Sequence, residues 1–433
     1  MNHGVTARVT WAGLLASMPL MLFSGAAAAG NGLNDIGFGT QSTAMGGADL
    51  AVTDGTSALN INPAGLTQIR HRAFDADVEP FWYISNSHTD QYDNHQRPTN
   101  PVSAVFGGGY AERLGSSNFV AGIGVFAQGG AGYIYDNLNT AFGTQDDVSA
   151  VFGLFRIEPG LAWKVNDQLS LGAALGLNYA QAREKFFPDT SYAPPGGGPG
   201  FDGFRLDGLS GWSGNLKVGL QFQLNPQWML AAAYTSKTQL KLDGGTLTMD
   251  DSSAGLGYVK YRDATLKGLA VAQEAGVGVS YRPTPEWILA FDLSWLDWSG
   301  ALKSTTLIAS NPDNPQAPNR LSLASALDWR DQYVVAVGIS YQWDEWTTLR
   351  GGYNYGRNPI PNGTLNPVLA VTAQSSYTLG FARKLSSQWD LAGTANYEPT
   401  QIESYNNPQL PFGPNARERW QALVGELSIS RRW

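Results

Sequence analysis

The sequence has 433 residues, no cysteine and a formal net charge of −8. The lack of cysteine excludes disulfides, thiolate metal sites and cysteine nucleophiles, and the negative charge argues against a nucleic-acid partner. Aromatic residues make up 12% of the chain and charged residues only 15%, yet the mean hydropathy is −0.21. This combination is typical of strands that face lipid on one side and water on the other.

Residues 1–28 have the pattern of a secretory signal peptide. Arg8 supplies the positive start, residues 9–23 form an apolar stretch, and residues 24–29 are small and suited to cleavage. The apolar stretch is shorter than the roughly 20 residues of a membrane-spanning helix. We therefore predict cleavage after Ala28, which would change the formal charge from −8 to −9 because only Arg8 is lost among the charged side chains.

The next segment differs from the rest of the chain. Residues 47–69, GADLAVTDGTSALNINPAGLTQI, are small and polar and follow neither a two-residue nor a helical repeat. Backbone groups in hydrocarbon must all be paired, so this segment is expected outside the bilayer, in the periplasm or inside a barrel.

From residue 73 onward a two-residue alternation recurs. In 287–295 and 333–343 every second residue is apolar, with aromatic residues at both ends, as in the girdles of outer-membrane barrels. The predicted strands are 74–85, 102–113, 117–129, 147–165, 168–186, 208–224, 227–243, 266–283, 286–302, 328–343, 345–358, 370–386, 388–404 and 417–433. These windows predict an all-β protein, a 14-stranded antiparallel transmembrane β-barrel spanning residues 73–433.

The connections support this topology. Short ones such as 166–167 and 283–285 alternate with long ones such as 188–207 and 304–328, as expected when tight turns face the periplasm and long loops face outward. The chain ends on Trp433, preceded at two-residue spacing by Ile429 and Leu427, which resembles the C-terminal signature of bacterial outer-membrane barrels. A soluble β-sandwich or propeller is the alternative, and no repeat at blade spacing supports it.

The stretch LNDIGFGTQSTAMGGADLAVTDGTSALNINPAGL resembles the N-terminal hatch of the FadL-type family of outer-membrane transporters for long-chain fatty acids and hydrocarbons. The triplet Asn62, Pro63 and Ala64 carries most of this likeness. Residues 121–135 and 328–361 are similar to the family's kinked third strand and to two of its later strands. The resemblance implies that residues 29–72 form a hatch inside the lumen, which fits the expectation that fourteen strands enclose more space than their side chains fill.

Alternation predicts which side chains face the lumen. Some charged residues alternate in step with small or polar residues rather than with large apolar ones, and these are expected to face the lumen. They are Asp75, Asp77, Glu79, Lys217, Glu274, Asp292, Arg330, Arg350 and Glu426. Each could form an ion pair that braces the hatch. The resemblance implies that Arg330 binds a ligand carboxylate, with Lys217 as a further candidate. The family's second basic position falls near residues 183–186. The alternation there points Phe186 inward and Arg183 and Lys185 outward, so the pair of basic residues that would bind an acid is incomplete. Hydrocarbons therefore stay open as substrates.

The remaining lumen is expected to be apolar, with Phe81, Tyr83, Phe126 and Phe186 as ligand contacts or as hatch packing. Gly129 and Gly130 mark a kink that would open the wall sideways, since glycine in a strand favours a bulge.

No catalytic arrangement stands out, and His71, His88 and His95 are interpreted as loop residues rather than metal ligands. The sequence thus predicts a monomeric, cofactor-free channel, not an enzyme, that lies among outer-membrane lipid and lipopolysaccharide and passively imports hydrophobic small molecules. A diffusion porin for polar solutes and a structural or adhesive barrel are the alternatives.

Overall fold

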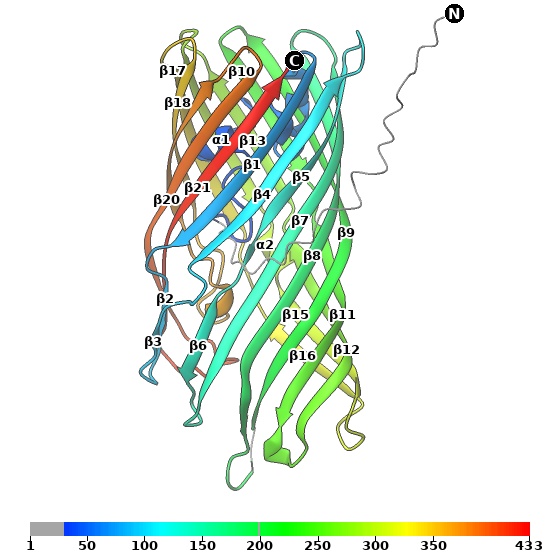
Figure 1. Cartoon of the computed structure of the whole chain (residues 1–433), viewed down its shortest axis with the longest axis vertical. Helices are drawn as coiled ribbons and strands as arrows, with labels where there is room; N and C mark the ends of the chain where they lie inside the picture. The colour runs from blue at the N-terminus through cyan, green and yellow to red at the C-terminus, as the bar shows by residue number, and fades with distance from the viewer. Residues whose placement is uncertain (1–29, 198–199) are drawn as a thin grey trace, which may run out of the picture.

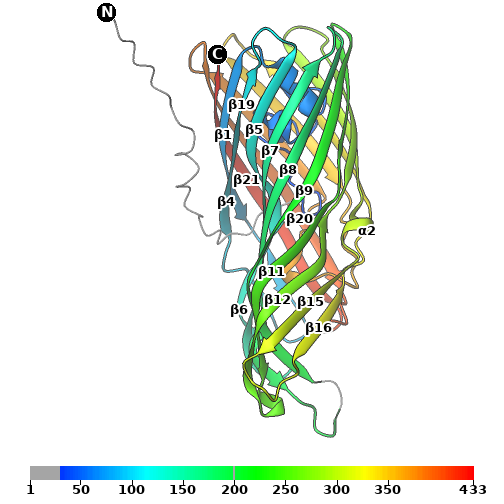
Figure 2. The same ribbon diagram turned by 90° about the vertical axis from the view of Figure 1, so that its right-hand side faces the viewer.

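The computed structural model describes residues 30–197 and 200–433, so the predicted signal peptide lies outside the described residues. Fourteen antiparallel wall strands form a closed barrel around a lumen (Figures 1 and 2). The first and last strands close it, because residues 73–83 pair with residues 422–432. No helix among the described residues is long and apolar enough to cross a membrane.

Several wall strands consist of two consecutive pieces. In chain order the wall contains β1 (Arg72–Tyr83), β4 (Val102–Arg113), β5 (Phe119–Ala131) with β6 (Ile134–Asn139), β7 (Gln145–Lys164), β8 (Leu169–Tyr192), β9 (Phe201–Asn225), β10 (Trp228–Thr235) with β11 (Thr238–Asp251), β12 (Gly257–Val271) with β13 (Glu274–Tyr281), β14 (Trp287–Leu296) with β15 (Ser304–Pro312), β16 (Arg320–Ala326) with β17 (Gln332–Gln342), β18 (Thr347–Gly356), β19 (Ser375–Lys384), β20 (Trp389–Tyr405) and β21 (Ala416–Arg432). Short elements outside this wall are β2 (Ser87–Thr89), β3 (His95–Gln96), η4 (Ser252–Ala254), α2 (Trp298–Ala301) and η5 (Pro367–Leu369).

The outer face carries an apolar band between two aromatic girdles. On β14, Leu289, Phe291 and Leu293 are exposed, and Trp287 and Trp295 lie at the two ends of the same face. One girdle, at the short turns, contains Trp163, Trp228, Trp287, Trp343 and Trp346, and the other contains Trp82, Trp212, Tyr234, Tyr333, Tyr355, Tyr377 and Tyr397. The band explains why large apolar side chains are exposed here, since lipid rather than water surrounds them.

The predicted strands match the wall across this band but not beyond it. Residues 188–207 and 304–328 were predicted as loops, and this was wrong: β8 continues to Tyr192, β9 begins at Phe201, and β15 and β16 form a hairpin. Past the second girdle a strand has no lipid face, so the alternation that identifies strands is no longer required. Four of the predicted strands also run into breaks between the observed strands, at residues 236–237, 272–273, 297–303 and 327–331.

The N-terminal segment, residues 30–71, lies inside the barrel toward the end that holds the C-terminus (Figures 1 and 2). It contains α1 (Thr40–Ala44), η2 (Thr56–Leu59) and η3 (Pro63–Gln68), which contact strands around the wall. Most of its residues are buried. Its position leaves the other half of the lumen to side chains of the wall and the long connections.

The lipid band gives a depth-dependent prediction. Phe291 lies midway between Trp287 and Trp295, so arginine at 291 should lower the free energy of unfolding by roughly 2–4 kcal/mol relative to alanine at 291. Arginine at Trp287, relative to alanine there, should cost roughly 0–1 kcal/mol because a girdle residue reaches water. Denaturant unfolding in lipid vesicles measures both, and equal costs at the two depths would contradict the band.

Candidate functional site: a polar docking region and an apolar cavity in the lumen

The N-terminal segment is fixed to the wall by Asp292, one of the charges predicted to face the lumen. The Asp292 carboxylate on β14 accepts hydrogen bonds from the backbone N–H groups of Asp49 at 2.7 Å and Leu50 at 2.9 Å. Opposite it on β13 lies Gly278, where an added Cβ would be 2.9 Å from the Leu50 Cβ. A buried carboxylate between two N–H donors is a strong, charge-assisted contact.

The Asn62–Pro63–Ala64 triplet makes a second attachment. Asn62 Nδ2 donates to the carbonyl oxygens of Leu50 and of Leu220 in β9, both at 3.0 Å, and its Oδ1 accepts from the Ala64 N–H at 3.2 Å. Asn62 thus begins η3 and at the same time ties it to the wall.

Wall glycines make this attachment possible. A Cβ at Gly172 of β8 would lie 2.3 Å from the carbonyl carbon of Pro63, and a Cβ at Gly219 of β9 would lie 2.0 Å from Asn62 Oδ1. Any side chain at either position would collide with the triplet. The sequence motif and these two glycines therefore form one packing unit.

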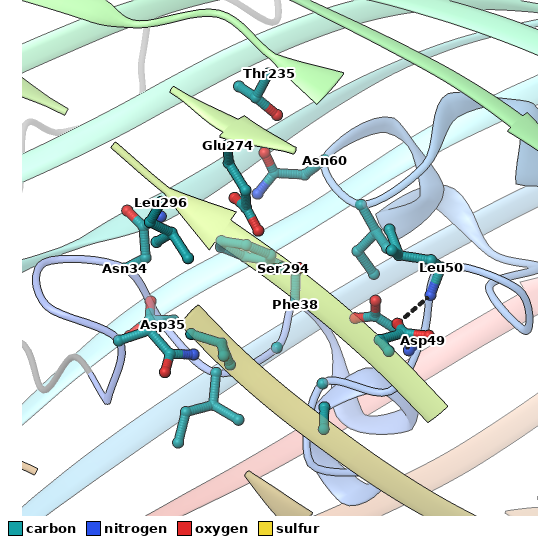
Figure 3. A pocket seen from close by; sticks show the side chains of 18 of the residues that line it. Asn34, Asp35, Phe38, Asp49, Leu50, Asn60, Thr235, Glu274, Ser294 and Leu296 are labelled. Atoms are coloured by element: carbon teal, nitrogen blue, oxygen red, sulfur yellow. Dashed lines mark hydrogen bonds between the residues drawn. The ribbon is translucent and has the colours of Figure 1, made fainter. Parts of the chain in front are cut away.

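A small polar chamber of about 90 Å³ separates the N-terminal segment from the wall (Figure 3). Arg156 donates to Asn178 at 2.8 Å and to Asn60 at 2.9 Å, and Lys217 Nζ lies 3.4 Å from the Ile61 carbonyl oxygen. The acidic residues at its border are Asp35, Asp49, Glu274 and Asp292. Lys217 faces the lumen as predicted, but it borders this polar chamber and not the apolar cavity described next, because it lies on β9 beside the N-terminal segment.

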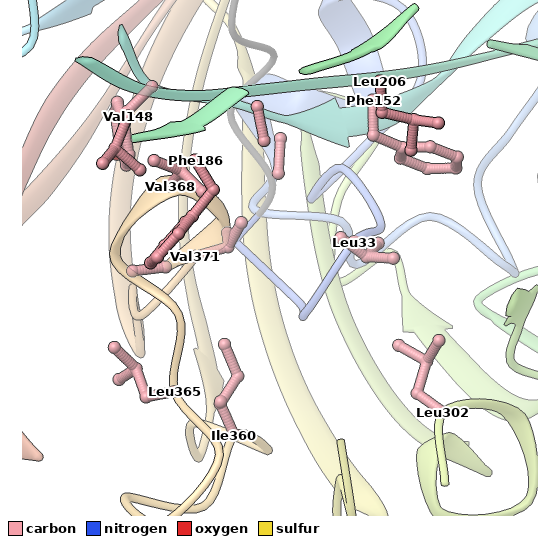
Figure 4. Packing of buried hydrophobic residues seen from close by; sticks show 14 of the residues in the cluster. Leu33, Val148, Phe152, Phe186, Leu206, Leu302, Ile360, Leu365, Val368 and Val371 are labelled. Carbon is pink, nitrogen blue, oxygen red and sulfur yellow. The ribbon is translucent and has the colours of Figure 1, made fainter. Parts of the chain in front are cut away.

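The second space is an apolar cavity of about 320 Å³ on the far side of the N-terminal segment. Its border includes Phe186, Leu206, Leu266, Leu302 and Trp329, and Leu33 reaches it from the N-terminal segment. Figure 4 shows how Leu33, Phe152, Phe186, Leu206 and Leu302 lie in the surrounding apolar cluster. The cavity suits a small hydrophobic molecule, since such ligands bind mainly by burying apolar area.

The four predicted aromatic contacts have different places. Phe186 borders the apolar cavity. Phe126 packs on Phe38 with ring centres 6.4 Å apart, so it supports the N-terminal segment. Phe81 is buried beside Asp35 near the same segment, and Tyr83 packs on Tyr133 and Trp420. Of the four, Phe186 alone borders the cavity.

Arg330 does not lie on a strand of the wall. The predicted strand 328–343 begins at Gln332 in the structure, and Arg330 belongs to the preceding connection, where it is exposed. Its neighbour Trp329 is buried and borders the cavity instead. The expectation of a lumen-facing cation was wrong because parity was extended through a break in the strand.

Sequence reasoning missed most of the cavity border. Leu206 and Leu307 lie in segments predicted as loops, and Leu33 belongs to the segment without a repeat. A signal existed at Glu184, which shares parity with Phe186 and borders the same cavity. Among the described residues, no group of three acidic or imidazole side chains is placed to hold a metal ion.

The wall is interrupted beside β5. The ladder between β4 and β5 ends at the pair Gly108–Val125, whereas the pairing of β5 with β7 on its other side continues through residues 129–131. Hydrogen bonding across this side resumes where the Thr99 N–H donates to the Ile134 carbonyl at 2.8 Å. The interruption lies between these two points.

Gly129 produces the bend at this interruption. Its φ of +115° is a conformation that other residues rarely adopt, and the register with β7 shifts between Ala127 and Gly129. A Cβ at Gly129 would lie 2.1 Å from the Leu33 carbonyl oxygen. The bend predicted at Gly129 and Gly130 is therefore in contact with the N-terminal segment.

A buried charge cluster supports the extracellular end of the lumen. His88 of β2, beyond the girdle residue Trp82, lies 2.5 Å from Glu418 and 3.1 Å from Asp90. Burial by itself lowers the pKa of an imidazole, but the two carboxylates outweigh it and raise the pKa of His88 to about 9. The His88 ring also packs on Phe412 with ring centres 4.7 Å apart, and Phe412 contacts Phe186 at the cavity.

The fold and the divided lumen define a class, a transmembrane β-barrel whose lumen holds an N-terminal segment of the same chain, residues 30–71. The family model described as outer membrane protein transport protein (OMPP1/FadL/TodX) matches residues 20–408. The chain therefore belongs to this family of outer-membrane proteins, and its location is the outer membrane.

Solved structures of similar fold agree with this. The chain is similar to the Ralstonia pickettii toluene transporter TbuX (20% identity, 92% of this chain and 99% of that chain, TM-score 0.72). It is also similar to the P. putida toluene transporter TodX (17%, 92% and 99%, 0.76) and to a Pseudomonas aeruginosa FadL homologue (17%, 93% and 99%, 0.71). At these identities the likeness concerns the fold. No curated protein sequence gave a significant match.

The His88 cluster predicts a pH dependence. Because the folded pKa of about 9 exceeds the ordinary value of 6.5, its stabilisation is complete below about pH 6.5 and is lost as pH rises through 9. The loss should reach up to about 3 kcal/mol for the local structure of residues 87–96. Hydrogen exchange of these amides, corrected for the intrinsic rate, measures it.

His88→Gln should remove the part of this pH dependence that His88 contributes, leaving that of Glu418, whose pKa burial raises to about 7, and His71→Gln, at an exposed position, should preserve the whole dependence. An unchanged slope in His88→Gln would contradict the assignment.

Proposed function

We propose that this protein passively admits uncharged hydrophobic small molecules across the outer membrane. The observation that carries this proposal is the apolar cavity of about 320 Å³ bordered by Phe186, Leu206 and Leu266. Membership of the OMPP1/FadL/TodX family supports it, as does the likeness to the toluene transporters TbuX and TodX.

The charges around the cavity favour uncharged substrates over fatty acids. Arg330 is exposed and does not border the cavity, and Arg183, which does, is exposed on the outward-facing side of β8. A buried carboxylate without a cation is costly by several kcal/mol. A hydrocarbon has no such requirement, and its affinity follows from the apolar area that it buries.

The proposed route has three stages. A molecule is captured at the extracellular ends of β8 and β9, passes to the apolar cavity, and leaves sideways where the β4–β5 ladder is interrupted. Residues 29–72 act as a hatch that keeps the polar half of the lumen closed. The attachments through Asp292 and Asn62 support this role, since each joins the N-terminal segment to the wall.

Two other functions fit less well. A diffusion porin for polar solutes requires an open lumen, whereas here the N-terminal segment is packed against strands around the wall. A structural or adhesive barrel has no use for an apolar cavity behind its loops.

The first test compares toluene with arabinose. Cells or vesicles carrying the intact barrel should take up toluene much faster than those without it, and arabinose no faster. Deleting residues 31–60 should admit arabinose, because the hatch and its attachments are lost. The hatch would be refuted if the intact barrel admitted arabinose, or if the deletion left arabinose uptake unchanged. The transport function would be refuted if toluene entered vesicles with the barrel no faster than vesicles without it.

The second test addresses the sideways exit. Gly129→Val is incompatible with a φ of +115° and with the Leu33 carbonyl, so it should remove the bend and lower toluene uptake severalfold. Gly153→Val is the matched control, because Gly153 lies on β7 opposite Gly130 and its nearest neighbour to an added Cβ is 4.0 Å away. Toluene binding to the purified protein should stay unchanged in both. Normal uptake by Gly129→Val would indicate straight passage into the periplasm.

A further inference from the structure

One acidic side chain borders the otherwise mostly apolar cavity. Glu184 lies on β8 between Ala182 and Phe186 on the inward parity, and the three pair with buried residues of β7. Lys185 lies on the opposite parity, with its Nζ 3.9 Å from Asp147. Glu184 thus faces the cavity. Of its two basic neighbours, Lys185 is occupied on the outside, and Arg183 borders the cavity with an exposed side chain.

Glu184 differs from three other polar side chains at this border. Thr364 donates to the Leu327 carbonyl, Asn407 to that of Leu365 and Gln409 to that of Ala326, so their polar atoms are used within the protein; the distances are 2.5, 3.1 and 3.2 Å. Within residues 30–197 and 200–433, no hydrogen bond or ion pair involves the Glu184 carboxyl. A carboxyl group in apolar surroundings without a partner is unfavourable, and a ligand that donates a hydrogen bond offsets that cost.

The neighbours of Glu184 leave room for a flat ring. The residue opposite it on β7 is Ala150, and the preceding residue on the same face is Ala182, both small. Phe152 lies opposite Ala182, and Phe186 lies next to Phe204, with ring centres 6.2 Å apart and nearly parallel planes. The result is a niche with a carboxyl group between two alanines and aromatic rings on either side.

We propose that Glu184 makes this cavity selective for uncharged aromatic molecules that carry a hydrogen-bond donor, such as phenols and anilines, over plain hydrocarbons, and that it rejects carboxylates. The aromatic ring packs against the phenylalanines, and the ligand O–H or N–H donates to the Glu184 carboxyl. An aromatic carboxylate instead brings a second negative group beside the first. This inference rests on the proposed function, because it assigns a preference to the same cavity.

The test measures binding of toluene, phenol and benzoate to the purified protein by calorimetry in detergent at neutral pH, with empty micelles as the blank. Glu184→Met replaces the carboxyl by an apolar group of similar length. It should lower the ratio of phenol to toluene affinity by about tenfold or more, since a hydrogen bond to a charged acceptor is worth at least that factor. Glu184→Gln should keep part of the phenol preference and improve benzoate binding.

Lys185→Gln is the matched control, because Lys185 faces outward from β8. It should leave the affinities for toluene, phenol and benzoate as in the native protein. A phenol-to-toluene ratio that is the same in the native protein and in Glu184→Met overturns the inference while toluene binding still supports the proposed function. Loss of toluene binding in the native protein would instead overturn the proposed function and the preference with it. Benzylammonium binding tighter than phenol would overturn the choice of uncharged ligands. Heat-modifiable migration of each variant confirms that the barrel is folded.

Discussion

The requirement that every backbone N–H and C=O group be paired in hydrocarbon determines the rest of this structure. It forces β1 to pair with β21, so the wall has no free edge in the membrane. A ring of fourteen strands then encloses more volume than wall side chains fill. The N-terminal segment occupies part of this volume, and its own polar groups create the need for partners on the wall such as the Asp292 carboxylate and the Leu220 carbonyl.

Polar and apolar regions are therefore separated along the lumen. Beside the N-terminal segment the wall supplies charged and amide side chains, because a segment without regular structure leaves backbone groups that must be satisfied. Beyond it the wall supplies Leu206, Leu266 and Phe186, and the cavity forms there. The attachment of the N-terminal segment and the apolar cavity thus both follow from the position of this segment in one half of the lumen. Leu33 is the residue of the segment that reaches the cavity.

Sequence reasoning succeeded where lipid imposes a pattern. Phe291 and its neighbours on β14 show a regular alternation because one face must be apolar, and the windows there match the wall. Beyond the lipid band the constraint disappears, so the hairpin of β15 and β16 was missed. Lumen residues were predicted by extending parity, which held for Asp292 and failed for Arg330, because a break at residues 327–331 resets the alternation.

Long-range packing could not be predicted at all from such a pattern. Nothing in the local sequence links Gly172 to Pro63 or Gly129 to Leu33, yet both contacts need glycine. Leu33 has a particular position among these contacts. Its side chain borders the apolar cavity, and its carbonyl oxygen lies against the bend at Gly129. Within the N-terminal segment, the apolar cavity and the bend beside the interrupted β4–β5 ladder thus meet at this one residue, away from the attachments at Asp292 and Asn62.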